Sequence, residues 1–358
     1  MLPTNAISML SVTNLIGRYK AMRSIRQLRA IPTGCYAFVG YGSHSTQNLY
    51  PVLDYLRVPL RYICVTSDAK ARLIARARPD TQVTTSLLDV LTDSAVKGVL
   101  VSATPSAHYS IASQVLASGK HLFVEKPPCQ SLAELHHLVE LQQRQGAGVS
   151  MVGLQKRFSP LTHTLSQRLA GDTPYSYSLH YLTGLYPEGD ALLDLFIHPI
   201  DLVCHLFGPA QVVCAERVNA GRGAVTLLVT LRHGCVAGVL QLSTAYTRAD
   251  AREELSINTA RGVYHLAQME SLTFTPKRGM CMGIPVEKVF PRASITEHLC
   301  GRSNFSPVMT NNQVVTQGYY GELKAFLDAV ERGVACRESS FDTLVPTYQL
   351  LEQLRATK

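Results

Sequence analysis

The chain has 358 residues, of which 46% are hydrophobic and 17% are charged, and its formal net charge is +8. This length predicts two domains, and the apolar content excludes a disordered chain. No uncharged apolar run reaches the roughly 18 residues of a membrane span, and the basic residues are too dispersed for a nucleic-acid surface. Nine cysteines without a CxxC pair indicate reduced thiols, so we expect a cytoplasmic protein that binds neither membrane nor nucleic acid.

Residues 1–34 form a basic extension that precedes the first predicted strand. It carries several arginines, and the first acidic residue of the chain is Asp54. Apolar residues recur in it at helical spacing, namely Leu15, Tyr19, Met22 and Ile25. Two interpretations stay open: a helix that packs on the body, or a presequence that would direct the protein to an organelle matrix.

Apolar strands and helices alternate over residues 35–150. This order is typical of a doubly wound parallel sheet covered on both faces, a Rossmann-type α/β domain. The predicted strands are 35–39, 61–66, 99–102 and 121–124, and the predicted helices are 43–56, 70–78, 107–118 and 131–146.

Residues 151–335 have a different pattern, which predicts an α+β domain with a large open, mostly antiparallel sheet. One helix is predicted over 191–207, another over 319–332, and residues 336–358 are assigned to a C-terminal helix. The predicted strands between them are 211–218, 224–231, 235–244, 254–259 and 272–275. An open sheet face of this size favours a homodimer or homotetramer formed through the C-terminal sheet.

Gly40 and Gly42 directly follow the first predicted strand and open the first helix. In this context the first glycine permits a tight turn, and the second lets the backbone approach a pyrophosphate at the helix N-terminus. Ser45 stands where the third glycine of the fingerprint is usual. We expect a dinucleotide here, with Ser43 and His44 among its contacts.

The end of the second strand bears on the choice between NAD and NADP. An acidic residue there binds the ribose 2′-hydroxyl of NAD, and Asp68 could serve. Ser67 with Lys70 or Arg72 nearby would instead accept the 2′-phosphate of NADP. Counting from the strand end favours Ser67 and hence NADP, and the alternative is that these residues merely cap the next helix.

Two further segments resemble the glucose–fructose oxidoreductase/inositol dehydrogenase (Gfo/Idh/MocA) family. One has Thr104, Pro105 and His108 after a strand, followed by the strand-end sequence Glu125-Lys126-Pro127. The other matches a family helix signature with Asp194, His198, Asp201 and Gly208. The resemblance covers about residues 35–335 and implies that Thr104, Pro105, His108, Glu125 and Lys126 lie at the nicotinamide cofactor.

The resemblance also implies a catalytic set of Lys126, His198 and Asp194. A lysine buried against the cofactor has a lowered pKa and can donate a proton to a substrate atom. Asp194 and His198 are four residues apart, so on one helix they would share a face and fix the imidazole tautomer. The segment 151–160 is similar to the family's first strand of the second domain, which places Arg157 at the substrate together with Asp194 and His198. The Lys126–Pro127 bond is expected to be cis.

No metal site is expected. His198, Asp201 and His205 lie near one predicted helix face, but no second ligand group with zinc spacing occurs. Departures from the family pattern are Ser45, the N-terminal extension and Phe196, which stands where glycine is common.

The sequence therefore predicts an NAD(P)-dependent dehydrogenase or reductase. By resemblance, its small-molecule substrate would be a sugar, a cyclitol, a nucleotide-linked sugar or a related polyhydroxy carbonyl compound. Two alternatives stay open: reduction of a C=N bond in a biosynthetic pathway, and a non-catalytic dinucleotide-binding sensor or regulator.

Overall fold

A computed structural model of the chain describes residues 15–22, 32–144, 148–290, 295–301 and 312–356. Residues 15–22 are helical, and the side chains of Leu15, Tyr19 and Met22 are 64–68% exposed. The expectation that this segment packs on the body through these residues is therefore wrong. Ile25 lies outside the described residues.

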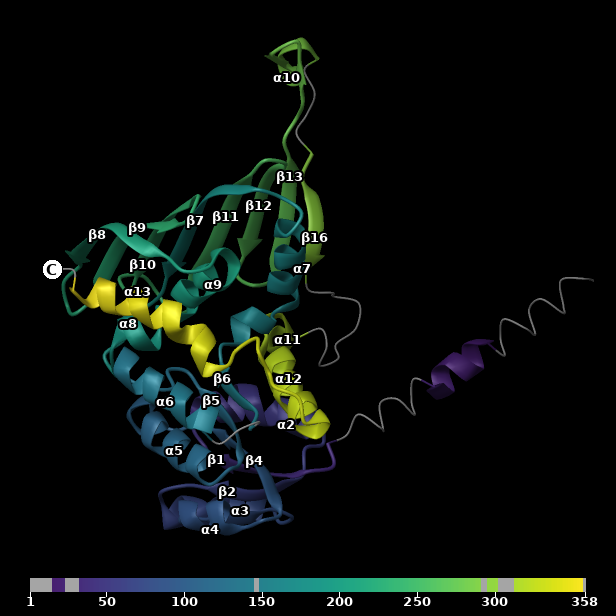
Figure 1. The fold of residues 1–358 in the computed structure, drawn as a ribbon, viewed down its shortest axis with the longest axis vertical. Helices are drawn as coiled ribbons and strands as arrows, with labels where there is room; N and C mark the ends of the chain where they lie inside the picture. Colours follow the sequence, from purple (N-terminus) through teal and green to yellow (C-terminus); the bar gives the residue numbers. More distant parts are fainter. Residues whose placement is uncertain (1–14, 23–31, 145–147, 291–294, 302–311, 357–358) are drawn as a thin grey trace, which may run out of the picture.

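The first sheet has six parallel strands in the order β3-β2-β1-β4-β5-β6, which is the Rossmann order (Figure 1). Its strands are β1 (Cys35–Val39), β2 (Leu60–Cys64), β3 (Gln82–Thr84), β4 (Val96–Val101), β5 (His121–Glu125) and β6 (Ser150–Gly153). Its helical segments are η1 (Ser45–Leu49), α2 (Tyr50–Tyr55), α3 (Asp68–Ala77), α4 (Leu87–Thr92), α5 (Pro105–Ala117) and α6 (Leu132–Arg144).

Alternate side chains of these strands enter two different cores. Ala37 of β1 belongs to the core that includes residues of α5 and α6, whereas Phe38 belongs to the core beneath α2. The second core also takes Phe326 from α12 (Tyr319–Arg332), whose ring lies 5.8 Å from that of Phe123. A helix from late in the chain thus covers one face of the first sheet.

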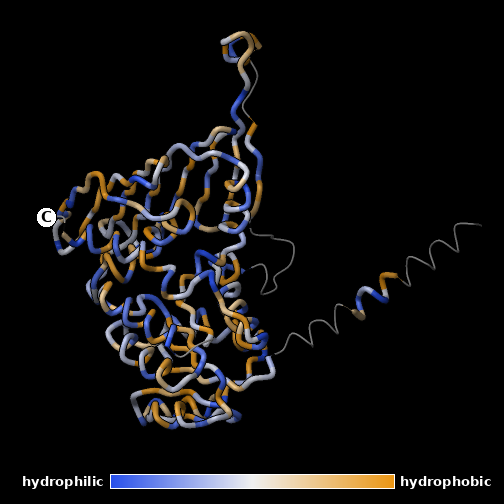
Figure 2. The backbone as a smooth tube through the Cα atoms, in the orientation of Figure 1, coloured by the Kyte–Doolittle hydropathy of each residue, from blue (hydrophilic) through white to orange (hydrophobic). Residues whose placement is uncertain are grey.

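The second sheet has eight strands in the order β16-β13-β12-β11-β7-β10-β9-β8, antiparallel except for the β7–β10 pair. Its strands are β7 (Pro174–Leu182), β8 (Gln211–Asn219), β9 (Val225–His233), β10 (Val236–Ser243), β11 (Arg252–Thr259), β12 (Gly262–Ala267), β13 (Ser271–Pro276) and β16 (Glu297–Gly301). Figure 2 shows apolar residues distributed through the strands of both sheets. The predicted fold class is confirmed.

Helices cover one face of the second sheet and join it to the first domain. They are η2 (Gln155–Phe158), α7 (Pro160–Leu169), α8 (Ala191–Asp194), α9 (Ile197–Phe207), α11 (Gln313–Thr316), η4 (Phe341–Leu344) and α13 (Val345–Ala356). α13 packs on both α9 and α6, so it bridges the domains (Figure 1). A small hairpin of β14 (Met280–Cys281) and β15 (Ile284–Pro285), followed by α10 (Val286–Val289), projects away from the sheet.

Two local expectations are wrong. The strand expected to open the second domain is β6, which pairs with β5 and completes the first sheet. The single helix expected over 191–207 is broken at Leu195 and Phe196 into α8 and α9.

Candidate active site

The turn after β1 opens a cavity at the carboxyl end of the first sheet. Gly40 has φ +112°, and a Cβ there would lie 2.0 Å from the carbonyl oxygen of Ser102, so the turn requires glycine. A Cβ at Gly42 would meet nothing within 4 Å, which leaves the backbone open to a ligand. The cavity measures about 560 Å³ and is lined by Val39, Gly40, Tyr41, Gly42, Ser43, His44, Ser45, Cys64, Val65, Thr66, Lys70, Thr85, Leu87, Ser102, Ala103, Thr104, Ala107 and Ile111.

Ser45 takes the place of the third glycine by using its hydroxyl group. The side chain is fully buried, and Oγ accepts a hydrogen bond from Gly42 N and donates one to Gly42 O, both at 3.0 Å. The helical turns from Ser43 onward begin at the cavity, and the N-terminus of a helix favours an anion. The geometry therefore fits a dinucleotide pyrophosphate.

The residues after β2 divide between the cavity and the next helix. Ser67 caps α3, its Oγ accepting from Lys70 N at 3.4 Å, and Asp68 is the first residue of that helix. Neither is among the cavity-lining residues, whereas Lys70 is. The described lining contains no acidic side chain. Ser67 thus caps α3, and the expected contacts of Ser67 and Asp68 with a cofactor stay predictions.

His108 is a structural link rather than a lining residue. It is 2% exposed, its Nδ1 donates to the Pro127 carbonyl at 2.8 Å, and its Nε2 accepts from Ala103 N at 3.2 Å. These bonds fix a neutral tautomer, and burial lowers the pKa of the imidazole. The expectation that His108 contacts the cofactor is corrected: it ties the Thr104 turn to the segment after β5. Thr104 lines the cavity, and Pro105 begins α5.

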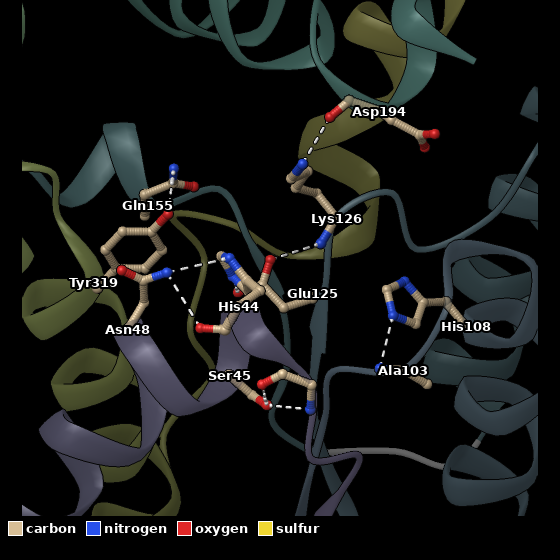
Figure 3. A network of polar contacts seen from close by, with 11 residues as sticks. His44, Ser45, Asn48, Ala103, His108, Glu125, Lys126, Gln155, Asp194 and Tyr319 are labelled. Carbon is tan, nitrogen blue, oxygen red and sulfur yellow. Dashed lines mark hydrogen bonds and ion pairs between the residues drawn. The ribbon is translucent and has the colours of Figure 1, made fainter. Parts of the chain in front are cut away.

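Lys126 stands at the end of β5 and reaches the second domain (Figure 3). Its Nζ donates to the main-chain carbonyl of Asp194 at 2.7 Å, and the Lys126–Pro127 bond is cis, as expected. Burial lowers the pKa of the ammonium, Lys156 lowers it further, and Glu125 and Asp194 oppose the shift. An ammonium with a lowered pKa loses its proton more readily, which suits a general acid.

Glu125 lies behind Lys126 and connects it with the glycine turn. Its Oε2 accepts from the backbone N of Lys126, and its Oε1 lies 3.2 Å from Nε2 of His44. The buried carboxylate keeps a lowered pKa because His44 and Lys126 outweigh its burial. Figure 3 shows this contact path from the glycine turn through His44 and Glu125 to Lys126.

Asp194 and His198 do not share one helix face, because the break after α8 separates them. The carboxylate of Asp194 accepts from the hydroxyl of Tyr186 at 3.2 Å, and burial raises its pKa. His198 is the second residue of α9 and lies within electrostatic range of Lys126, Lys156 and His44. Burial first, and then these charges, hold its pKa well below the usual value. Lys126 of the first domain and His198 of the second thus act on each other electrostatically.

Arg157 is not a substrate residue, contrary to expectation. It is 3% exposed, and its guanidinium donates to both carboxylate oxygens of Asp201, to the Glu338 and Thr343 carbonyls, and to the Thr343 hydroxyl. These contacts occupy all five N–H donors of an arginine. The pair fastens η2 to α9 and to the segment before α13.

Several residues of the site carry no sequence signal. Lys156 is 6% exposed, pairs with Glu253 of β11, and has its Nζ 5.1 Å from the ring centroid of Tyr181. Tyr319 of α12 accepts from the Gln155 amide at 3.4 Å, and its ring lies 5.6 Å from that of His44. Tyr186 comes from the loop before α8. Their partners come from other elements of the fold, which the sequence pattern does not reveal.

Two kinds of feature are absent from the described ranges. No three or more His, Cys, Asp or Glu side chains there are grouped to hold a metal ion. No described helix has both the length and the apolar character needed to cross a membrane.

The first domain matches a known family model. Residues 35–153 fit the oxidoreductase family with an NAD-binding Rossmann fold that is named for Gfo, Idh and MocA. The match to the Gfo/Idh/MocA family model is therefore to the first domain, about a third of the chain.

The curated relatives that the chain matches are distant. YceM of Salmonella typhimurium is 27% identical over 49% of this chain and 58% of its own length, so the match spans little more than half of that relative. An inositol 2-dehydrogenase of the same organism is 25% identical over 32% of this chain and 36% of its own. The NADP-dependent scyllo-inositol 2-dehydrogenase IolW of Bacillus subtilis is 25% identical over 59% and 63%.

Solved structures share the whole fold. A dehydrogenase from Chromobacterium violaceum has a TM-score of 0.75 at 20% identity, covering 90% of this chain and 94% of that one. KijD10, a 3-ketoreductase from Actinomadura kijaniata solved with NADP, has a TM-score of 0.71 at 16% identity, covering 90% and 97%. At these identities the likeness establishes the fold of both domains.

Proposed function

We propose that the protein is an NAD(P)-dependent oxidoreductase that transfers a hydride between the nicotinamide and a sugar, cyclitol, nucleotide-linked sugar or related polyhydroxy carbonyl compound. The observation that carries the proposal is the position of Lys126. Its ammonium lies at the carboxyl end of β5, in the sheet that bears the glycine turn, and is held by Asp194 of the other domain. Ligands of open α/β sheets bind at this end of the strands.

The chemistry divides between the cofactor and the chain. The bound nicotinamide supplies or accepts the hydride. In the reduction direction Lys126 donates a proton to the carbonyl oxygen, and its lowered pKa makes this transfer easier. His198 is neutral and can accept a hydrogen bond or a proton from a substrate hydroxyl. The Asp194 carbonyl orients the ammonium between turnovers.

We further propose that NADP is preferred over NAD. Lys70 lines the cavity beside Tyr41, its Nζ 5.9 Å from the ring centroid, and the described lining has no carboxylate to pair with a ribose 2′-hydroxyl. A lysine in this position stabilises the extra phosphate of NADP.

The test combines binding with turnover. Thermal-shift titrations with NAD, NADP and their reduced forms identify the cofactor, because a ligand of the folded state raises Tm. A panel of polyols, ketoses, nucleotide sugars and cyclic imines then identifies the reaction. Turnover of an imine alone would indicate C=N reduction, and cofactor binding without any turnover would indicate a sensor.

Lys126→Met provides the matched mechanistic test. We expect the variant to bind NADP as the wild type does and to lose at least a hundredfold in kcat, the usual contribution of a general acid. Lys277→Met removes an exposed lysine in the second domain and serves as the control. Equal kcat for Lys126→Met and the wild type would refute the role of Lys126.

We also propose that the protein forms a homodimer or homotetramer through the outer face of the second sheet. That face exposes Leu228, Val239 and Val263 by 40–52% on three strands, β9, β10 and β12. Light scattering should report a dimer or tetramer for the wild type and smaller species for Val239→Asp. A monomeric wild type would refute this proposal.

We propose a cytoplasmic location. A fluorescent fusion of the full chain should stay in the cytoplasm, as should a fusion that lacks residues 1–34. Accumulation of the full chain alone in an organelle would show that the basic extension is a presequence.

A further inference from the structure

The loop of residues 183–190, between β7 and α8, contacts the side-chain carboxylate of Asp194, whereas Lys126 contacts the main-chain carbonyl of the same residue. Tyr186 Oη donates to Oδ2 of Asp194 at 3.2 Å, while the main-chain oxygen of Asp194 accepts from Nζ of Lys126 at 2.7 Å. Asp194 therefore stands between a tyrosine of the second domain and the lysine of the first.

Backbone hydrogen bonds and a glycine fix the conformation of the loop at this contact. Thr183 continues the β7–β10 pairing. Its N–H donates to the Ser243 carbonyl at 2.8 Å, and its carbonyl accepts from Tyr246 N at 3.0 Å. A Cβ at Gly189 would lie 2.3 Å from Asp194 Oδ2 and 3.3 Å from the Tyr186 ring. Only glycine at 189 lets the phenol and the carboxylate meet in this arrangement.

Asp194 needs such support because α8 has only four residues and ends there. A helix of one turn is not stable without tertiary contacts. Its start is fixed by Asp190, which accepts from Leu192 N at 2.9 Å and from Arg355 at 2.8 Å. At its end, Asp194 makes the contacts with Tyr186 and Lys126, and the helix is then interrupted before α9 begins.

We propose that Tyr186 is a positioning residue: by holding the carboxylate of Asp194, it sets the main-chain carbonyl that orients the ammonium of Lys126. The proposal rests on the proposed function of Lys126. Tyr186 does not itself need to touch the substrate.

The protonation states of the neighbouring groups are consistent with this role. Burial raises the pKa of Tyr186 to about 12; Asp194 and Glu188 add to this shift, and Arg248 opposes it. The phenol therefore remains a hydrogen-bond donor at neutral pH. Burial, the largest effect, raises the pKa of Asp194, whereas Lys126 and the Tyr186 hydrogen bond lower it. The titratable groups that interact with Lys126 are Glu125, Asp194, Lys156 and His198.

The first experiment measures Asp194 directly and needs no substrate. Carbon-13 NMR of carboxyl-labelled aspartate follows each titration, and Asp194→Asn assigns the signal. We expect Tyr186→Phe to raise the titration midpoint of Asp194. Tyr246→Phe is the matched control, because its hydroxyl donates to Asp250 at 3.1 Å on the exposed surface. An unchanged midpoint in Tyr186→Phe would overturn the proposal.

The second experiment measures catalysis on the substrate found in the panel. We expect Tyr186→Phe to lower kcat at least tenfold with unchanged NADP affinity. The basic limb of the pH profile should move to lower pH, because a less well held ammonium is deprotonated more easily. Gly189→Ala keeps the hydroxyl but crowds the contact, and should shift the limb in the same direction.

The two results separate the proposals. In one outcome, the wild type turns over no substrate of the panel while Tyr186→Phe still shifts the titration midpoint of Asp194. That result would refute the proposed function and leave Tyr186 only as a support of Asp194. Wild-type turnover with an unmoved pH profile in both Tyr186→Phe and Gly189→Ala would defeat the positioning role.

Discussion

Asp201→Asn tests the assignment of Arg157 to structure. Both partners are 2–3% exposed, and Asp201 accepts from Nε at 2.8 Å and from Nη2 at 2.5 Å. The substitution preserves shape but leaves a buried guanidinium without its counter-charge, which costs about 3–5 kcal/mol. With a Tm change of about 2–4 °C per kcal/mol for a domain of this size, we expect a loss of about 6–20 °C.

Differential scanning calorimetry and urea unfolding measure this loss. Arg144→Ala removes a surface ion pair with Glu140 and should leave Tm nearly unchanged, because exposed pairs contribute little. NADP affinity should be unaffected in the fraction of Asp201→Asn that is folded. A variant that keeps wild-type stability but has a raised substrate KM would refute the reasoning and return Arg157 to the substrate site.

Three further substitutions probe the site from other sides. Glu322 of α12 is fully buried, and neither of its carboxylate oxygens has a hydrogen-bond partner among the described residues. Burial raises its pKa well above the usual value, so stability falls as pH rises beyond about 4.5. Glu322→Gln should therefore raise Tm more at pH 8 than at pH 5, and an equal change at both would contradict the shift. His108→Phe leaves the Ala103 N–H and the Pro127 carbonyl without their hydrogen-bond partner, which costs about 1–3 kcal/mol of stability for each group. The variant should have a lower Tm and a lower kcat, with unchanged NADP affinity in a calorimetric titration. Lys70→Ala should weaken NADP binding about 10–100-fold and NAD binding little, and equal losses for both cofactors would exclude a 2′-phosphate contact.

The first domain was predictable because its strands are continuous apolar runs next to turn residues. The runs over β1, β4 and β5 are mostly buried, and burial on both faces of a strand favours apolar side chains. β3 was missed because it has three residues and none is fully buried. β6 was placed in the wrong sheet, since a strand's sequence does not reveal its partner.

The site was predictable where chemistry depends on local spacing, as for Gly40, Gly42 and Lys126. It was not predictable where a contact joins distant segments. Arg157 and Asp201 are buried charges whose partners come from the fold, and neither differs in sequence from a substrate-binding residue. The spacing of Asp194 and His198 suggested one helix, yet the chain turns between them so that Asp194 can offer its carbonyl to Lys126.

The most direct measurement is the single-turnover rate of hydride transfer, followed by nicotinamide absorbance at saturating NADPH and substrate, in wild type and Lys126→Met. If the ammonium supplies the proton, the variant's rate falls by two orders of magnitude or more at unchanged NADPH affinity. A variant that consumes NADPH at the wild-type rate would contradict the account of this site.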